Sequence, residues 1–233
     1  MPDNPLAIAL KLIAGADPEL REIISLSLLV SGSALAASCT LGIPLGAAIA
    51  IGKWPGQSVL KLLVSIAMGL PPVVVGLVLY LLLSRQGALG WLAILYTPQA
   101  MILAQTILAT PIVAGFAAET LGAANRKYGE LLRSLALSRR AALATLLVES
   151  RAGLVAAALA GFGRAISEVG AVLVVGGNIA HATRIMTTAI ALETSRGELS
   201  RALALGIILL LLALVVNLLL FAVRAKLART TPR

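Results

Sequence analysis

The sequence predicts an all-α integral membrane protein with about five transmembrane helices. Hydrophobic residues make up 59% of the 233-residue chain and charged residues only 12%, and the mean hydropathy is +0.99. An ordinary soluble domain carries about a quarter charged residues. Four runs contain no charged residue, and each is long enough for a helix of about 20 residues to cross the hydrocarbon core once. These runs are 23–52, 62–84, 86–118 and 202–223.

The predicted elements begin with an extracytoplasmic segment, 1–22, followed by the crossing in 23–52. In the second run, Pro71 and Pro72 precede an apolar stretch, and they predict a kink because proline removes a backbone donor and clashes with the preceding turn. The run 86–118 is too long for one straight helix. We therefore expect Gly87–Tyr96 to form a surface loop and the third crossing to begin at Thr97–Pro98.

A further crossing is expected at about residues 152–175, although this stretch contains Arg164 and Glu168. The last crossing is 202–223. The transmembrane domain is thus predicted as 23–223 with a cytoplasmic loop at 126–151, and a basic cytoplasmic tail follows at 224–233.

The positions of the lysines and arginines predict the orientation. With five crossings the termini lie on opposite sides, and most of the 19 basic residues are cytoplasmic if the N-terminus is outside. The positive-inside rule therefore favours an outer N-terminus and a cytoplasmic C-terminus. The net charge of +9 is then explained by topology and by contact with anionic lipid, and not by nucleic-acid binding.

A polar, basic island at Tyr128–Arg151 interrupts the apolar runs. In helical phase, Leu131, Leu135 and Leu137 form a partial apolar stripe, while the intervening charged and hydroxyl side chains stay solvated. Such a segment can dock a soluble partner in the cytoplasm. The alternative is a solvated connector between two membrane helices.

The island resembles the E-A-A…L-G-A-S loop of ATP-binding-cassette importer permeases. In that family the loop forms a short coupling helix that sits in a groove of the cytoplasmic ATPase subunit. Here Ala136 stands where the family usually has glycine, and a proline that commonly closes the motif is missing around Val148–Glu149. The coupling residues implied by the resemblance are Glu130, Leu131, Leu132, Arg133, Ser134, Leu135, Ala136, Leu137 and Ser138.

Other blocks resemble molybdate-type permeases of the same family over about residues 17–223. They include L-P-P-V-V-V-G at 70–76, A-Q-T at 104–106 and G-R-A-I-S-E-V-G-A at 163–171. The segments 176–179 and 187–194 are most similar to the tungstate-uptake branch. The resemblance implies an ABC-importer fold and ATP-driven import of a tetrahedral oxyanion, most like tungstate, with molybdate or sulfate as alternatives.

Candidate pathway residues lie in the blocks that carry this resemblance. Arg164 and Glu168 are four residues apart, on one helical face, and charges inside a membrane usually pair or line a wet path. Pairing with each other or across a dimer is one interpretation. The other is that Arg164 attracts an oxyanion while Glu168 weakens its binding. The further candidates are Ser167, Gln105 and Thr106.

The outer loop 178–201 contains the candidates for contact with an extracytoplasmic binding protein, Asn178, His181 and Arg184. No metal site is expected around the single histidine. An intramembrane protease would need a base or paired aspartates within the spans, and the chain has no P-loop, so we expect no enzyme activity. A secondary carrier is disfavoured because no inverted repeat or acidic relay is visible.

The expected assembly follows from the resemblance. Two copies of the chain would enclose the pathway and present two coupling loops to two cytoplasmic ABC ATPase subunits. An extracytoplasmic binding protein would deliver the anion to a permease in the prokaryotic inner membrane. This chain is expected to bind no cofactor, since ATP and Mg²⁺ belong to the ATPase.

Overall fold

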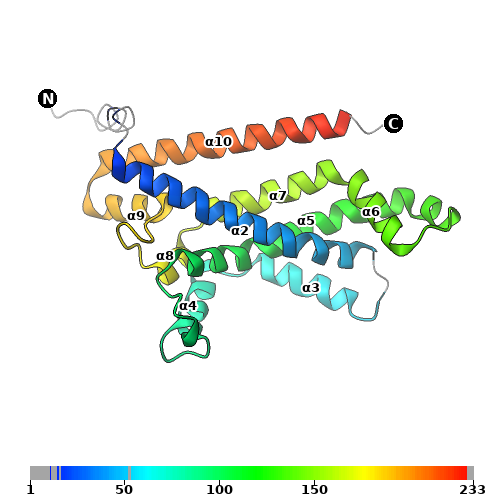
Figure 1. The fold of residues 1–233 in the computed structure, drawn as a ribbon, viewed down its shortest axis with the longest axis horizontal. Coiled ribbons are helices and arrows are strands. Elements are labelled where there is room, and N and C mark those ends of the chain that lie inside the picture. The colour runs from blue at the N-terminus through cyan, green and yellow to red at the C-terminus, as the bar shows by residue number, and fades with distance from the viewer. Residues whose placement is uncertain (1–10, 12–14, 16, 52–53, 230–233) are drawn as a thin grey trace. The chain divides into compact units, whose positions relative to one another are not determined.

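The computed structural model describes residues 11, 15, 17–51 and 54–229, and within these residues it contains helices and turns but no strand. Three long helices are each apolar enough to cross a membrane (Figure 1). They are α2 (Pro18–Ile51), α5 (Pro98–Ser134) and α10 (Leu199–Arg229). The shorter helices are α3 (Gln57–Met68), α4 (Pro72–Leu83), the 3₁₀ turn η1 (Gly90–Leu92), α6 (Arg139–Glu149), α7 (Arg151–Ile166), α8 (Gly170–Gly176) and α9 (Met186–Arg196).

The chain packs as two compact units, and α2, α5, α7 and α10 each contribute a part to both. The first unit contains α4, η1, α8 and α9, and the second contains α3 and α6. The first unit is formed by the described residues of Met1–Ala34, Pro71–Gln105 and Arg164–Val216, and the second by those of Leu35–Leu70, Thr106–Gly163 and Asn217–Arg233.

In the first unit, the start of α2 packs against α9 and the start of α10. Their core cluster consists of Leu20, Ile23, Met186, Ala189 and Leu205. The other close contact is between α4 and α8. A Cβ atom on Gly76 would lie 2.8 Å from the Cα of Ala171, so only glycine permits this approach.

In the second unit, the later part of α2 packs closely against α5. A Cβ atom on Gly46 would lie 2.7 Å from the carbonyl oxygen of Ala114 and from the Cβ of Ala117. Close approach of small residues is the usual way in which membrane helices pack. Two apolar clusters complete the unit: Ile49 with Val64 and Ala114, and Leu121 with Leu132 and Leu146.

The predicted number of five crossings agrees only with the highest count that the structure allows. The described residues contain three helices able to cross, or five if each of two bent pairs counts as one crossing. The interruption expected at Pro71-Pro72 is confirmed, because α3 ends at Met68 and α4 begins only at Pro72. The prediction that the third crossing begins at Thr97–Pro98 agrees with the start of α5.

The predicted crossing at 152–175 is wrong as a single helix. Helix α7 ends at Ile166, and α8 starts only at Gly170. The reason lies in Glu168, because its carboxylate oxygen Oε1 accepts a hydrogen bond from the backbone N–H of Ala171, 3.0 Å away, and so caps a new helix start.

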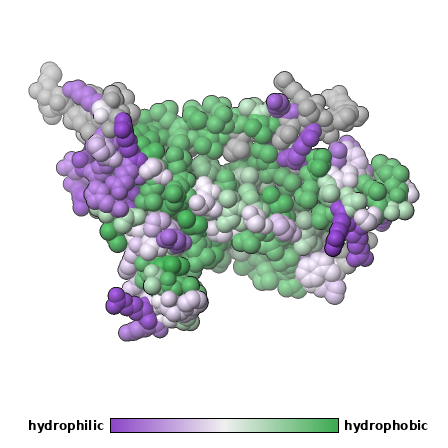
Figure 2. All heavy atoms as spheres, viewed as in Figure 1, coloured by the Kyte–Doolittle hydropathy of each residue, from purple (hydrophilic) through white to green (hydrophobic). Residues whose placement is uncertain are grey.

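The surface of the long helices fits a lipid environment. Large apolar side chains of α10 are exposed, and Figure 2 shows hydrophobic residues along much of this helix. Hydrophilic residues gather instead where α2 begins beside α9 (Figure 2). Of the predicted terminal segments, residues 1–10, 12–14 and 16 at the N-terminus and 230–233 in the basic tail lie outside the described residues.

Candidate functional site

The predicted coupling residues form the end of α5 and the turn before α6. Glu130–Ser134 are the last residues of α5, and 135–138 connect it to α6. The island is therefore not one amphipathic helix, as its apolar stripe predicted, but two helices separated by a turn. Leu132 is buried against Leu121 and Leu146, and this contact fixes the turn to the second unit.

The turn is a helix C-cap of the Schellman type. The N–H of Leu137 donates to the carbonyl of Leu132, and the N–H of Ala136 donates to the carbonyl of Arg133. Ala136 has a φ of 50°, in the left-handed region that favours glycine. A glycine would adopt this conformation without strain, whereas this chain carries alanine at the position.

The next helix has a side-chain cap. The hydroxyl Oγ of Ser138 accepts from the backbone N–H of Ala141 at 3.3 Å and begins α6. Nearby, a side-chain hydrogen bond to Tyr128 raises the pKa of Lys127 above its ordinary value. The ammonium group lies 4.9 Å from the centroid of the Tyr128 ring.

The turn leaves a group of apolar side chains exposed next to charged ones. Leu131, Leu135 and Leu137 are 55%, 60% and 42% exposed. Glu130 and Arg139 beside them are exposed as well. An exposed leucine patch rimmed by charges is typical of a protein–protein contact surface. We call the residues 130–138 the coupling segment.

The charged pair of the predicted pathway is in direct contact. The guanidinium Nη2 of Arg164 lies 3.2 Å from Oε2 of Glu168. Glu168 is 3% exposed and Arg164 is 30% exposed. The backbone oxygen of Glu168 accepts from the hydroxyl of Thr187 at 3.0 Å, so the turn between α7 and α8 is also bonded to α9. The mutual pairing considered from the sequence is therefore present, and Arg164 keeps an accessible edge.

The other pathway candidates lie in α5 and in the turn between α7 and α8. Gln105 is buried in α5, and neither polar atom of its side chain has a hydrogen-bond partner among the described residues. Thr106 is also buried, and its carbonyl accepts from the hydroxyl of Thr110 at 2.7 Å. Ser167 is exposed and donates to the carbonyl of Arg164 at 3.3 Å.

The outer-loop candidates are held by partners within the first unit. His181 Nδ1 lies 2.8 Å from Oε2 of Glu22, and Arg184 donates to Oε1 of Glu19 at 3.2 Å. The side-chain amide of Asn178 donates to the carbonyl of Thr188 at 3.3 Å. His181 and Arg184 are therefore both held against the first turns of α2.

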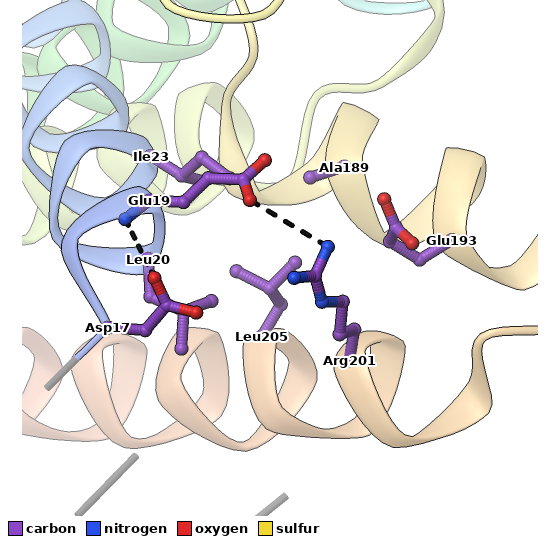
Figure 3. A pocket seen from close by; sticks show the side chains of 8 residues that line it. All are labelled: Asp17, Glu19, Leu20, Ile23, Ala189, Glu193, Arg201 and Leu205. Carbon is purple, nitrogen blue, oxygen red and sulfur yellow. Dashed lines mark hydrogen bonds and ion pairs between the residues drawn. The ribbon is translucent and has the colours of Figure 1, made fainter. Parts of the chain in front are cut away.

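A charged cluster at the start of α2 was not predicted as a site. Figure 3 shows a pocket in which the carboxylate of Glu19 on α2 points toward Arg201 of α10, and apolar side chains complete the lining. The guanidinium Nη1 of Arg201 is 3.7 Å from Oε2 of Glu19, and Glu193 of α9 is buried beside it. The sequence signal for this cluster is the acidic run of Asp17, Glu19 and Glu22.

The described residues contain no group of three or more His, Cys, Asp or Glu side chains placed to hold a metal ion. What the geometry offers is a contact surface at the α5–α6 turn, a buried ion pair at a helix break, and a charged outer cluster. None of these arrangements contains a paired nucleophile and base.

Comparison with known proteins places these features in a family context. Residues 42–229 match the family described as the binding-protein-dependent transport system inner membrane component. The match includes the coupling segment, the Arg164–Glu168 pair and the outer loop.

Individual relatives match over most of their length. The chain is 44% identical to a probable anion ABC transporter permease of Haloferax volcanii, with 85% of this chain and 88% of the relative covered. It is 35% identical to the tungstate uptake system permease of Peptoclostridium acidaminophilum, covering 94% and 96%. It is 28% identical to the molybdenum transport system permease of Escherichia coli, covering 85% and 90%.

Proposed function

The chain belongs to the family of binding-protein-dependent transport system inner membrane components, and on this basis we propose that it is the permease of an importer for tetrahedral oxyanions. As a member of this family it is a transport subunit in the inner membrane and not an enzyme. It works with an ATPase and a substrate-binding protein.

Tungstate is the cargo that we propose. The observation that carries this choice is the 35% identity to a tungstate uptake permease over 94% of the chain. Molybdate is the second candidate, because the molybdenum permease of Escherichia coli matches over a similar length with a lower identity of 28%. These oxyanions are of the same tetrahedral class, so the membrane pathway requires the same chemistry for either.

The proposed assembly is a homodimer with two ATPase subunits. Two copies of this chain enclose the pathway and present two coupling segments on the cytoplasmic side. In this arrangement the N-terminus is extracytoplasmic and the C-terminus cytoplasmic, as the distribution of basic residues favours. The binding protein contacts the outer end, at the loop of Asn178, His181 and Arg184.

We propose that the coupling segment transmits movement from the ATPase to the transmembrane helices. Its exposed leucines enter a groove of the ATPase, while buried Leu132 connects the segment to the core of the second unit. ATP binding closes the ATPase pair and turns the cavity outward, and hydrolysis returns it inward. ATP and Mg²⁺ are held by the ATPase, so the permease itself needs no cofactor.

Arg164 is the proposed anion contact in the pathway. Its guanidinium group supplies planar, permanently charged donors that suit an oxyanion. The neighbouring Glu168 carboxylate, 3.2 Å away, competes for these donors and so keeps the anion from binding too tightly for transport.

The proposal is tested by reconstituting the permease with its ATPase and binding protein in liposomes. ATP hydrolysis is measured with tungstate, molybdate or sulfate bound to the binding protein. We expect tungstate to give the largest stimulation over the anion-free level. If only sulfate stimulates, the cargo is wrong, and if the permease copurifies with no ATPase and transports without ATP, the importer mechanism is wrong.

A further inference from the structure

A hollow of about 560 Å³ lies between α3 and α5 within the second unit. One face of α3 contributes Gln57, Ser58, Lys61 and Ser65, which follow the spacing of a helical face. The facing side of α5 contributes Glu119, Gly122 and Arg126. None of these residues belongs to the coupling segment or to the candidate pathway residues.

The lining of the hollow changes from apolar to charged along its length. At one end a Cβ atom on Gly115 would lie 3.0 Å from the sulfur of Met68, so α3 and α5 are in near contact there. Towards the other end, Lys61 and Arg126 enter the lining. Arg126 turns back along its own helix, because its Nη1 lies 3.5 Å from where a Cβ atom of Gly122 would be.

The two cations of the hollow have no ion-pair partner among the described residues. The single carboxylate in the lining is Glu119, so the three charged groups sum to one positive charge. The hydroxyls of Ser58 and Ser65 add neutral donors, whereas the Gln57 amide already donates to the carbonyl of Ile49. Ammonium and guanidinium groups with neighbouring hydroxyls form charge-assisted hydrogen bonds to tetrahedral oxyanions.

We infer that this hollow binds a tetrahedral oxyanion group between Lys61 and Arg126. The group can be a free oxyanion or the phosphate of an anionic lipid, because the hollow is larger than one such ion and has an apolar end. If the hollow is the release site for the transported anion, this role rests on the proposed function and on a cytoplasmic position of Lys61. Glu119 would keep the binding weak, as release requires.

The test measures the chemical reactivity of Lys61 in the full-length permease, assembled with its ATPase in nanodiscs of neutral phosphatidylcholine. An amine-acylating reagent is applied with increasing tungstate, and modification of each lysine is quantified by peptide mass spectrometry. We expect at least about threefold protection of Lys61 at saturation, because a bound anion occupies its ammonium group. Lys127 is the internal control, since it is exposed but lies outside the hollow.

A second arm replaces tungstate with phosphatidylglycerol in the nanodisc. Protection by tungstate in neutral lipid identifies a free-oxyanion site, and protection by phosphatidylglycerol alone identifies a lipid-phosphate site. If neither protects Lys61 more than Lys127, the inference is overturned. This result is independent of the proposed function, because the assay needs no transport or ATP hydrolysis.

Variants locate the bound group. Arg126→Ala should raise the anion concentration for half-protection about tenfold, and Arg126→Lys should restore most of the protection, since it keeps the charge. Glu119→Gln should lower that concentration by a few-fold because a repelling carboxylate is removed. If Arg126→Ala and Glu119→Gln both leave the protection curve unchanged, the anion is not bound in this hollow.

Discussion

The backbone N–H of Leu137 reaches back to the carbonyl of Leu132, 3.4 Å away, and closes the C-terminus of α5. Within the turn that this bond closes, the residue that makes the reversal possible is Ala136, with a φ of 50°. Leu132 is buried and Leu137 is exposed, so the bond joins the core of the second unit to the surface proposed to contact the ATPase.

Ala136→Gly should stabilise the permease. An alanine in the left-handed region costs roughly 1–2 kcal/mol, and the substitution removes this strain. Part of the stabilisation is lost because glycine has more conformational freedom in the unfolded chain. A net stabilisation of about 1 kcal/mol is expected. The measurement is the thermal unfolding midpoint of the purified protein in detergent.

Ala144→Gly is the matched control. Ala144 lies in α6 with ordinary helical geometry and an exposed side chain. The same substitution should therefore destabilise the protein by about 1 kcal/mol. If both variants shift the midpoint in the same direction, the left-handed strain at Ala136 is not the cause.

Glu130→Lys combined with Leu135→Asp should abolish tungstate uptake while the permease still inserts. Both side chains are exposed on the coupling segment, so the change alters the docking surface and not the core. Uptake and copurification of the ATPase are measured together. The membrane abundance of the variant is measured beside them as the control for insertion. Normal uptake by the coupling variant means that the segment is only a connector.

A cysteine placed at Ser195 in a Cys39→Ser background should react with a membrane-impermeant thiol reagent applied outside intact cells. One placed at Ser138 should react only after permeabilisation. Both positions are exposed, so access depends on the side of the membrane. Because Ser138 caps α6, a cysteine at exposed Ser134 repeats the measurement without removing the cap. The opposite labelling pattern reverses the proposed orientation.

Composition and charge spacing predicted the helical membrane fold, because a helix that crosses lipid requires a long apolar run without charged residues. The start of α5 was also predictable, since Pro98 fits the first turn of a helix. The break after Ile166 was not. It depends on a hydrogen bond from Ala171 to the carboxylate of Glu168, and local hydrophobicity carries no signal for such a bond.

The candidate site was predicted at the level of segments. The coupling residues were placed by their resemblance to a known loop, whereas the Schellman turn at Ala136 became visible only from backbone angles. The partners of His181 and Arg184 lie on α2, more than 150 residues away in sequence. Pairings over such separations depend on tertiary packing, which spacing along the chain does not encode.

The Arg164–Glu168 pair gives the last prediction, and the structure determines how it must be tested. An exchange of the two residues is uninformative, because position 168 is buried and an arginine there cannot accept the hydrogen bond from Ala171. A neutral pair, Arg164→Gln with Glu168→Gln, avoids this defect. The glutamine carbonyl can still accept that bond, and no buried charge is left without a partner.

If Arg164 only neutralises Glu168, the neutral pair should transport normally. Because we propose that Arg164 contacts the oxyanion, we expect the neutral pair variant to lose tungstate uptake by about tenfold or more. Its membrane abundance and basal ATP hydrolysis should stay normal. The single variant Arg164→Gln is the companion control. It leaves the buried Glu168 carboxylate unpaired, so a fall in its abundance that the neutral pair reverses would separate the structural cost from the transport defect. Substantial uptake by the neutral pair would remove Arg164 from the pathway and leave mutual neutralisation as its role.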